Sequence, residues 1–371
     1  MILEDDKLKQ NFEAELENLK KQVKRTNILI LGKTGVGKSS LINTIFGEKI
    51  ADVSHTKPET RGFHKYTSPT LPINIIDSEG YELETSSSFC DNIDEFIDSK
   101  FTNVQDQIHI AWYCISISGA RVLPYDLENI EHILSKNIPT SVIFTQADND
   151  TPEGDTAKAL ANIITEKFGS KVPTFQMSDD RDLNEKELDS DKLVDWSSEN
   201  INDENVKISF IMSQKANLKI KFAKAHKIIA GYAVSAGGIA ASPIPMSDAA
   251  LLVPLQTAMV SHIFHIYGLN IGVSSIIKNI IGTRLMSMLG KTAVVSLLKF
   301  IPGVGTAAGI AINVTIATTF TLSLGYAMSK LAEQLIKNQL DGIFSNEAIE
   351  KIFTKENLEF YMNEYATQKK S

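Results

Sequence analysis

Eight consecutive residues near the amino terminus have the types and spacing of a phosphate-binding loop. They read Gly32-Lys33-Thr34-Gly35-Val36-Gly37-Lys38-Ser39, match the pattern G-x-x-x-x-G-K-[ST] at every fixed position, and are followed by Ser40. Glycines let the backbone turn tightly, so that successive N–H groups can face phosphate oxygens. We expect Lys38 to contact the β- and γ-phosphates and the Ser39 hydroxyl to ligate Mg²⁺. The loop therefore predicts a nucleoside triphosphate site.

A second motif, Asp77-Ser78-Glu79-Gly80, follows an apolar run of strand length. An acid in this position can hold Mg²⁺, usually through water, and the Gly80 N–H can contact the γ-phosphate. That contact would be lost on hydrolysis, so residues 79–92 are a candidate switch.

The segment 55–63, HTKPETRGF, lies between these two motifs. A threonine here could ligate Mg²⁺ when the γ-phosphate is present. Thr60 is the first choice because it precedes the Arg61-Gly62 turn, and Thr56 is the alternative. The residues expected to act in catalysis are Lys38, Thr60 and Gly80, and those expected at the metal are Ser39, Thr60 and Asp77.

The sequence Thr145-Gln146-Ala147-Asp148 follows the apolar run TSVIF. The Asp148 carboxylate can accept hydrogen bonds from N1–H and the 2-amino group of guanine. Adenine offers neither donor, and a buried unpaired carboxylate is costly, so the site would discriminate strongly. The Gln146 side chain has an aliphatic stem that can lie on the base, and Ser178 can complete the pocket. A guanine nucleotide is the expected ligand, as GTP or GDP with Mg²⁺.

The elements that position these motifs alternate between strands and helices. The expected strands are residues 27–32, 73–77, 108–117, 140–144 and 174–177. The expected helices are residues 38–46, 89–102, 125–135, 155–168 and 193–201. This alternation predicts an α/β P-loop domain, with a mainly parallel sheet and helices on both faces. We place this domain at residues 25–204, after an amphipathic helix at residues 1–24 in which Phe12 and Leu16 share one face.

Residues 205–371 carry no strand pattern and predict an all-α hydrophobic domain. Three windows, 228–247, 249–277 and 300–329, contain no charged residue. Pairs of residues 57 apart suggest an internal repeat of a helix, an Ile-Pro turn and a helix ending at glycine. These pairs are Ile244-Pro245 with Ile301-Pro302, Gln256 with Asn313, and Gly268 with Gly325. We expect residues 330–366 to form one final helix of mixed charge.

Charge is distributed unequally between the two halves. Residues 1–203 hold 21 Lys and Arg against 36 Asp and Glu, a net charge of −15, whereas residues 204–371 hold 16 against 9, a net charge of +7. The acidic half argues against nucleic-acid binding. Two cysteines, Cys90 and Cys114, and a charged amino terminus are typical of a cytoplasmic protein without a signal peptide.

With the three motifs in register over residues 26–178, the chain resembles Era/TrmE-like small GTPases of the translation-factor class. Residues 109–126 are similar to bacterial members that carry a C-terminal helical domain. Residues 205–340 resemble the YcjF-like hydrophobic domain of unknown function, through Pro243-Ile244-Pro245, Asp248-Ala249, Gln256, Met259 and Tyr267-Gly268. The resemblance implies a GTPase coupled to a membrane-associated or self-associating helical module.

Two positions depart from the family's pattern. Thr145 and Gln146 stand where related enzymes have Asn and Lys, which puts nucleotide affinity in question more than base choice. Tyr81 stands where Ras-like enzymes carry a water-orienting glutamine, so we expect slow turnover by the monomer and faster turnover in a homodimer of G domains or with a partner.

Three interpretations of function follow. The first is a GTP-dependent switch whose helical half contacts the cytoplasmic face of a membrane through residues 205–340, peripherally or as an integral part, or packs as a soluble core. The second is an oligomerising membrane-remodelling GTPase similar to dynamin-related and immunity-related GTPases. The third is a nucleotide-binding interaction module without significant turnover.

Overall fold

The computed structural model describes residues 2–46, 63–78, 93, 95–99, 106–151, 153–178, 188–214, 217–241, 248–269, 310–343 and 345–368. Contacts divide the chain into two compact units. One unit is Val23–Asn217, and the other combines Met1–Gln22 with Leu218–Ser371. The first unit contains the sheet, and the second contains only helices among the described residues.

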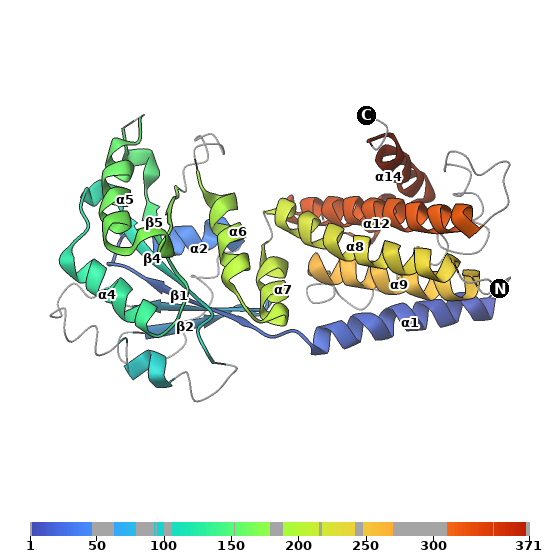
Figure 1. The fold of residues 1–371 in the computed structure, drawn as a ribbon, viewed down its shortest axis with the longest axis horizontal. Helices are drawn as coiled ribbons and strands as arrows, with labels where there is room; N and C mark the ends of the chain where they lie inside the picture. Colours follow the sequence, from blue (N-terminus) through green and yellow to red (C-terminus); the bar gives the residue numbers. More distant parts are fainter. Residues whose placement is uncertain are drawn as a thin grey trace. The chain divides into compact units, whose positions relative to one another are not determined.

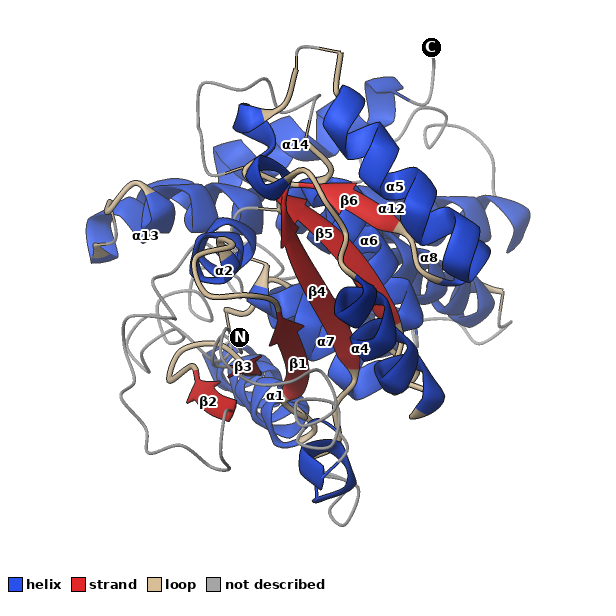
Figure 2. Ribbon diagram, turned by 90° about the vertical axis from the view of Figure 1, so that its left-hand side faces the viewer, coloured by secondary structure: helices blue, strands red, loops and turns tan. Residues whose placement is uncertain are grey.

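Six strands of the first unit form one sheet in the order β2-β3-β1-β4-β5-β6 (Figure 2). Neighbouring strands are parallel except for the edge pair β2 and β3, which is antiparallel. The strands are β1 (Thr26–Leu31), β2 (Phe63–Thr67), β3 (Ile73–Ser78), β4 (Ile110–Ser116), β5 (Thr140–Thr145) and β6 (Thr174–Gln176). The edge strand β2 was not expected from the sequence.

Helices cover both faces of this sheet (Figure 1). One core cluster joins the sheet to α4 and α5 and to Ile93, Phe96 and Ile97. The helices α2, α6 and α7 pack on the opposite face. These helices are α2 (Lys38–Phe46), α4 (Pro124–Ser135), α5 (Asp155–Phe168), α6 (Ser190–Asn200) and α7 (Glu204–Ser213). Short 3₁₀ turns lie at η1 (Ile117–Gly119), η2 (Ala147–Asn149) and η3 (Gly169–Lys171). The predicted α/β P-loop fold is confirmed.

The central strands are buried because helices cover them on both sides. Every residue of β1 and β5 is buried, as expected for parallel strands enclosed by two helical layers. On the face of α2 and α7, Phe46 stacks on Trp112 with ring centroids 6.0 Å apart, and Phe210 meets both rings edge-on. The indole N–H of Trp112 donates to the Ser197 hydroxyl at 3.1 Å, so the only polar atom of this large side chain is paired.

The second unit is helical, as the sequence predicted. Its helices are α1 (Ile2–Lys21), α8 (Leu218–Ala240), α9 (Asp248–Ile266), α12 (Ile310–Leu340), α13 (Asn346–Ile352) and α14 (Lys355–Gln368). Helix α1 packs on α9, where the Phe12 ring meets the Phe264 ring edge-on at 5.9 Å, and Phe264 in turn meets Phe353 at 5.7 Å. The apolar face of the N-terminal helix therefore belongs to the core of the helical unit.

Glycines allow α8 and α12 to pack closely. A Cβ on Gly325 would lie 2.6 Å from the Ile229 side chain, and one on Gly237 would lie 2.7 Å from the Thr318 hydroxyl. Gly325 thus lies inside α12, whereas Gly268 follows the end of α9 at φ +78°. The predicted repeat, in which both glycines end a helix, is wrong for this pair. Its Ile-Pro pairs lie outside the described residues.

The single helix predicted for residues 330–366 is also wrong. Helix α12 ends at Leu340, and Gly342 turns the chain with a φ of +73°. The Ser345 hydroxyl then accepts from the Ala348 N–H at 3.2 Å to begin α13. The Thr354 hydroxyl accepts from the Asn357 N–H at 3.2 Å to begin α14. Two local capping residues therefore divide the segment into three helices.

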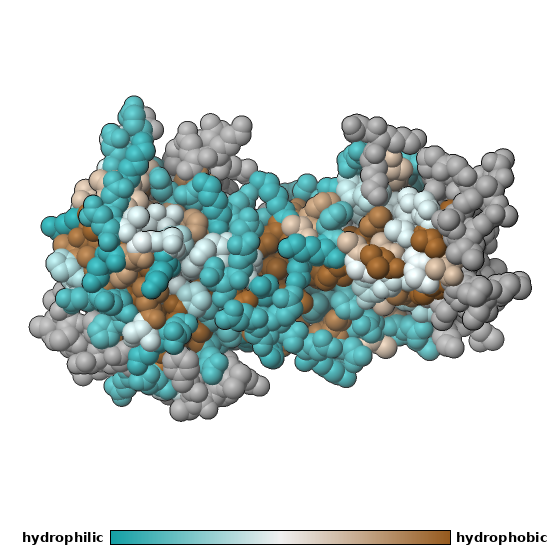
Figure 3. Space-filling model, viewed as in Figure 1, coloured by the Kyte–Doolittle hydropathy of each residue, from teal (hydrophilic) through white to brown (hydrophobic). Residues whose placement is uncertain are grey.

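Among the described residues, every helix falls short of the length or apolarity needed to cross a bilayer. Some apolar side chains do reach the surface: Val234 of α8 is 75% exposed, and brown residues are visible on the helical unit in Figure 3. Membrane contact through residues 205–340 stays a prediction.

Replacing Phe12 with alanine tests the place of α1 in the helical core. Phe12 is fully buried, so F12A should lower the free energy of unfolding by about 3–5 kcal/mol. Chemical denaturation followed by circular dichroism measures the loss. The matched control, E17A, removes an exposed side chain of the same helix and should change stability by less than about 0.5 kcal/mol. Equal stability of both variants would show that α1 does not pack on α9.

Candidate functional site

The phosphate-binding loop joins the end of β1 to the start of α2. Gly32, Gly35 and Gly37 adopt φ values of +144°, +78° and +95°. At Gly32 the need for glycine is also steric, because a Cβ would lie 2.6 Å from the Cys114 carbonyl oxygen. The loop is thus curled against β4, and the helix that follows directs its positive end toward the same point.

The Lys38 side chain folds back across this loop. Its ammonium donates to the carbonyl oxygens of Gly32 and Lys33 at 3.0 and 3.3 Å, and Lys38 is 8% exposed. The Asp77 carboxylate, at the end of β3, lies 3.6 Å from the same nitrogen. The structure therefore brings together the lysine of the first motif and the acid of the second. A buried cation held mainly by neutral carbonyls is a strong attractor for phosphate.

The other residues of the loop differ in exposure. Thr34 and Ser39 are exposed, Ser40 is half-buried, and Val36 is buried. Lys33 is half-buried, and its ammonium lies 5.1 Å from the centre of the Tyr125 ring, a distance typical of a cation–π contact. The Ser39 hydroxyl is thus accessible at the first turn of α2.

Thr145 and Gln146 hold the loop from the end of β5. The Thr145 hydroxyl donates to the Val36 carbonyl oxygen, and the Gln146 side-chain amide donates to the Gly35 carbonyl oxygen at 3.4 Å. The Gln146 amide oxygen accepts from the hydroxyls of Ser116 and Ser118 at 2.5 and 2.9 Å. These bonds fix Gln146 in the left-handed region, at φ +57°. The loop expected to bind phosphate and the segment expected to bind the base are therefore tied together.

Asp148 and Ser178 lie together at the carboxyl end of the sheet, after β5 and β6. The Ser178 hydroxyl donates to one carboxylate oxygen of Asp148 at 2.6 Å, and the Ala147 N–H donates to the Met177 carbonyl at 3.1 Å. Asp148 is exposed, and its second carboxylate oxygen has no hydrogen-bond partner within the described part of the chain. One oxygen is thus positioned by serine and the other is available to a ligand.

Some predicted site residues cannot be placed. Thr60, its alternative Thr56, Gly80 and the candidate switch segment 79–92 lie outside the described residues. Of the segment 55–63, only Phe63 is described. The partners of Gln146, Ser116 and Ser118, were not identified from the sequence. Ser116 is the last residue of β4, and Ser118 lies in the turn η1 that follows it. The carboxyl ends of parallel strands meet at the same end of a sheet, which is the signal that could have found them.

Cys114 lies beneath the loop but is not a reactive group. Burial raises the pKa of its thiol to about 12, so it stays protonated at neutral pH. The side chain packs beside Gly32. Its contribution to the site is therefore packing.

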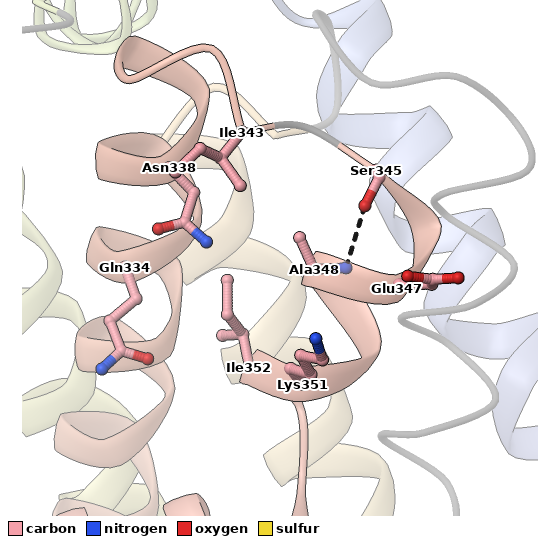
Figure 4. Close-up of a pocket in the computed structure, with 8 residues that line it drawn as sticks. All are labelled: Gln334, Asn338, Ile343, Ser345, Glu347, Ala348, Lys351 and Ile352. Carbon is pink, nitrogen blue, oxygen red and sulfur yellow. Dashed lines mark hydrogen bonds between the residues drawn. The ribbon is translucent and has the colours of Figure 1, made fainter.

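A small pocket of about 280 Å³ lies in the helical unit (Figure 4). It lies between the end of α12 and α13, and none of the predicted nucleotide-site residues lines it. Its lining residues are Gln334, Asn338, Ile343, Ser345, Glu347, Ala348, Lys351 and Ile352. One lysine beside one glutamate gives this pocket little net charge for phosphate.

Comparisons with known proteins find GTP-binding relatives. A sequence model of the family described as 50S ribosome-binding GTPase matches residues 27–146, and one described as a domain of unknown function (DUF697) matches residues 211–355. A probable GTP-binding protein EngB of Caldanaerobacter subterraneus subsp. tengcongensis is 32% identical over 160 residues, which are 42% of this chain and 74% of the relative. The EngB of Aquifex aeolicus is 28% identical over 137 residues, 37% of this chain and 73% of the relative. The crystal structure of a probable GTP-binding protein engB aligns with a TM-score of 0.35 at 22% identity, covering 47% of this chain and 98% of that one.

The steric role of Gly32 gives a direct test of the loop. In G32A the new Cβ must push β4 or the loop away, at a cost of about 1–3 kcal/mol. Affinity for a fluorescent guanosine diphosphate should fall by about 5- to 100-fold, as measured by titration. G231A, where a Cβ meets open space on α8, is the control and should bind normally. Normal affinity in G32A would mean that the loop does not need its curled conformation.

Proposed function

Since this chain belongs to the P-loop GTPases of the 50S ribosome-binding GTPase family and carries a domain of unknown function after its G domain, we propose that it binds GTP with Mg²⁺, hydrolyses it slowly to GDP and phosphate, and acts as a switch on its helical half. The observation that carries the proposal is the position of Lys38, folded across a curled loop beside Asp77. A phosphate chain in the loop would take the place of the carbonyl contacts of this ammonium.

The residues around the loop fit Mg²⁺. The Ser39 hydroxyl is exposed at the first turn of α2, and the Asp77 carboxylate is near the same end of the sheet. No group of three or more His, Cys, Asp or Glu side chains gathers among the described residues, so a cation here would take most of its ligands from phosphate and water. When bound, Mg²⁺ neutralises charge on the β- and γ-phosphate oxygens.

The chain's own groups supply the remaining stabilisation. Backbone N–H groups of Gly35 to Ser39 and the Lys38 ammonium hold the phosphates and offset the charge of the leaving group. The half-buried position of Asp77 limits the water that could screen these charges. These groups bind and polarise the triphosphate, and none of them is placed to orient the attacking water.

Base choice rests on the Asp148 carboxylate. One oxygen is held by Ser178, so the carboxylate has a fixed direction, and the other oxygen can accept from guanine. The bonds of Gln146 to the loop and to the hydroxyls of Ser116 and Ser118 would keep the aliphatic stem of this side chain in place beside the base. A glutamine held by several hydrogen bonds can replace the usual lysine in positioning, although not in charge.

Slow turnover follows from the residue after the second motif. Tyr81 has no amide with which to orient water as glutamine does in Ras-like enzymes. A missing group can come from a second chain, so pairing of G domains would raise the rate. The homodimer is therefore part of the proposal.

The aromatic cluster of Phe46, Trp112 and Phe210 supports a link to the helical half. Phe46 is the last residue of α2, whose first turn lies at the phosphate-binding loop, and Phe210 belongs to α7. Helix α7 ends at Ser213, and α8 of the helical unit begins at Leu218. A shift of α2 with the nucleotide would thus reach the helix that leads into the second unit.

Phosphate release from GTP tests the function. We expect the full chain with Mg²⁺ to release phosphate slowly, with a rate per chain that rises with protein concentration. K38A removes the charge in the loop and should lower the rate by about 10- to 100-fold. K171A, which removes an exposed lysine on η3, is the control. A rate unchanged in K38A would contradict hydrolysis at this site. A fast rate that does not depend on protein concentration would contradict the need for pairing.

A further inference from the structure

A cavity in the sheet unit lies at the amino-terminal ends of the parallel strands, whereas the phosphate-binding loop lies at their carboxyl-terminal ends. Its lining includes Arg25, His109 and Pro139, which directly precede β1, β4 and β5, whereas the loop follows the end of β1. The volume is about 750 Å³, within the range of about 300–1,000 Å³ usual for small-molecule sites. Nothing in the proposed GTPase function uses this cavity.

The charge of the cavity is opposite to that of its unit. Residues 23–217 hold 19 Lys and Arg against 31 Asp and Glu, a net charge of −12. The cavity lining has four basic side chains and two acids, which are Lys24, Arg25, Lys65 and Lys136 against Asp106 and Asp203. A local excess of positive charge in an acidic unit favours an anion at this place.

The three lysines of the lining are each paired with an acid. Lys24 lies 2.6 Å from Asp203, Lys65 lies 3.1 Å from Asp106, and Lys136 lies 2.8 Å from Asp98. These pairs fix the rim of the cavity and largely neutralise the lysines. The cation that decides what the cavity binds is therefore Arg25.

Arg25 bonds only to neutral groups. One guanidinium nitrogen donates to the carbonyl oxygens of Ser68, Leu71 and Ile73 at 3.0–3.1 Å. None of the described acids forms an ion pair with it. The second terminal nitrogen thus keeps its donors for a ligand, and guanidinium is the group best suited to phosphate or carboxylate.

His109 supplies a second donor. Its Nδ1 accepts from the Asn27 N–H at 2.9 Å, so a neutral ring carries its proton on Nε2. Burial is the main cause that lowers its pKa, which keeps the ring neutral at pH 7. Within the described part of the chain, no acceptor is bonded to Nε2.

The wall also has an acceptor and an apolar part. Asn74 is 4% exposed, and its amide nitrogen donates to Asn27 at 2.7 Å, but its amide oxygen has no hydrogen-bond partner among the described residues. This amide oxygen is closed off from solvent, so it belongs to the floor of the cavity and not to its accessible surface. Apolar side chains complete the wall, namely Val23, Ile108, Ile138, Pro139 and Val206.

We propose that this cavity binds a small organic anion the size of a nucleoside monophosphate, with its phosphate or carboxylate held by Arg25 and His109. The apolar side chains contact the organic part of the molecule. The site is separate from the guanine nucleotide, so both can be bound at once.

Calorimetric titration of the full chain, kept saturated with GDP, tests the proposal. The probes are AMP for a phosphate anion, citrate for a carboxylate anion, and adenosine for the same ring without charge. We expect AMP, citrate or both to bind, and adenosine to bind at least about tenfold more weakly than AMP. Binding of AMP would show that the cavity recognises phosphate, and binding of citrate that it recognises carboxylate. Failure of both at millimolar concentration overturns the proposal, as does equal binding of adenosine and AMP.

Two variants show whether the anion binds in this cavity. Asn137 lines it, is exposed and has a φ of +59°, which aspartate also tolerates, so N137D adds a negative charge without a change of shape. This variant should weaken anion binding by at least about threefold. Its isosteric control, N162D on the exposed face of α5, should not.

R25A should abolish anion binding while GDP binding stays normal. Because Arg25 also holds the chain between β2 and β3, GDP affinity serves as the check that R25A is folded. If R25A does not fold, N137D alone decides. Anion binding that is the same in N137D and N162D would place the anion elsewhere and overturn the assignment, whether or not the chain binds GTP.

Discussion

The hydrogen bond from the Thr145 hydroxyl to the Val36 carbonyl ties the two ends of the nucleotide site to each other. Val36 belongs to the loop after β1, and Thr145 is the last residue of β5, 109 positions later in the chain. Parallel strands bring both to one edge of the sheet, and the bond then fixes the loop relative to Asp148, three residues further on. Together with the bond from Gln146 to the Gly35 carbonyl, it holds the predicted phosphate-binding loop at a fixed place relative to the predicted base site. The curled conformation of the loop and the left-handed conformation of Gln146 both depend on this contact region.

Helix α2 joins this site to the opposite face of the sheet. Its first residue, Lys38, reaches the loop, and its last residue, Phe46, packs in an aromatic cluster with Trp112 and Phe210. Aromatic side chains that interlock in a packed core transmit small displacements because the core has few voids. The loop and α7 thus both contact one helix, and the proposed switch relies on that shared element.

Much of the sheet could be predicted because its central strands are apolar runs enclosed on both faces, as in residues 140–144. The edge strand β2 could not, since Phe63–Thr67 reads FHKYT, which is neither an apolar run nor a regular alternation, and its pairing with β3 is a tertiary contact. Likewise, the apolar face of the N-terminal helix is visible in the sequence, but its packing on α9 is not. At the candidate site, fixed spacing predicted the loop and Asp148. The serines that hold Gln146 come from the end of β4 and the turn after it, and no local pattern marks them.

Selective guanine nucleotide binding is the central claim, and calorimetric titration of the full chain with non-hydrolysable GTP and ATP analogues in the presence of Mg²⁺ tests it most directly. The geometry of Asp148 and Ser178 predicts that the GTP analogue binds and that the ATP analogue binds at least about 100-fold more weakly, since adenine offers no donor to the carboxylate. Equal affinities for the two analogues, or no binding of the GTP analogue at millimolar concentration, would contradict the account.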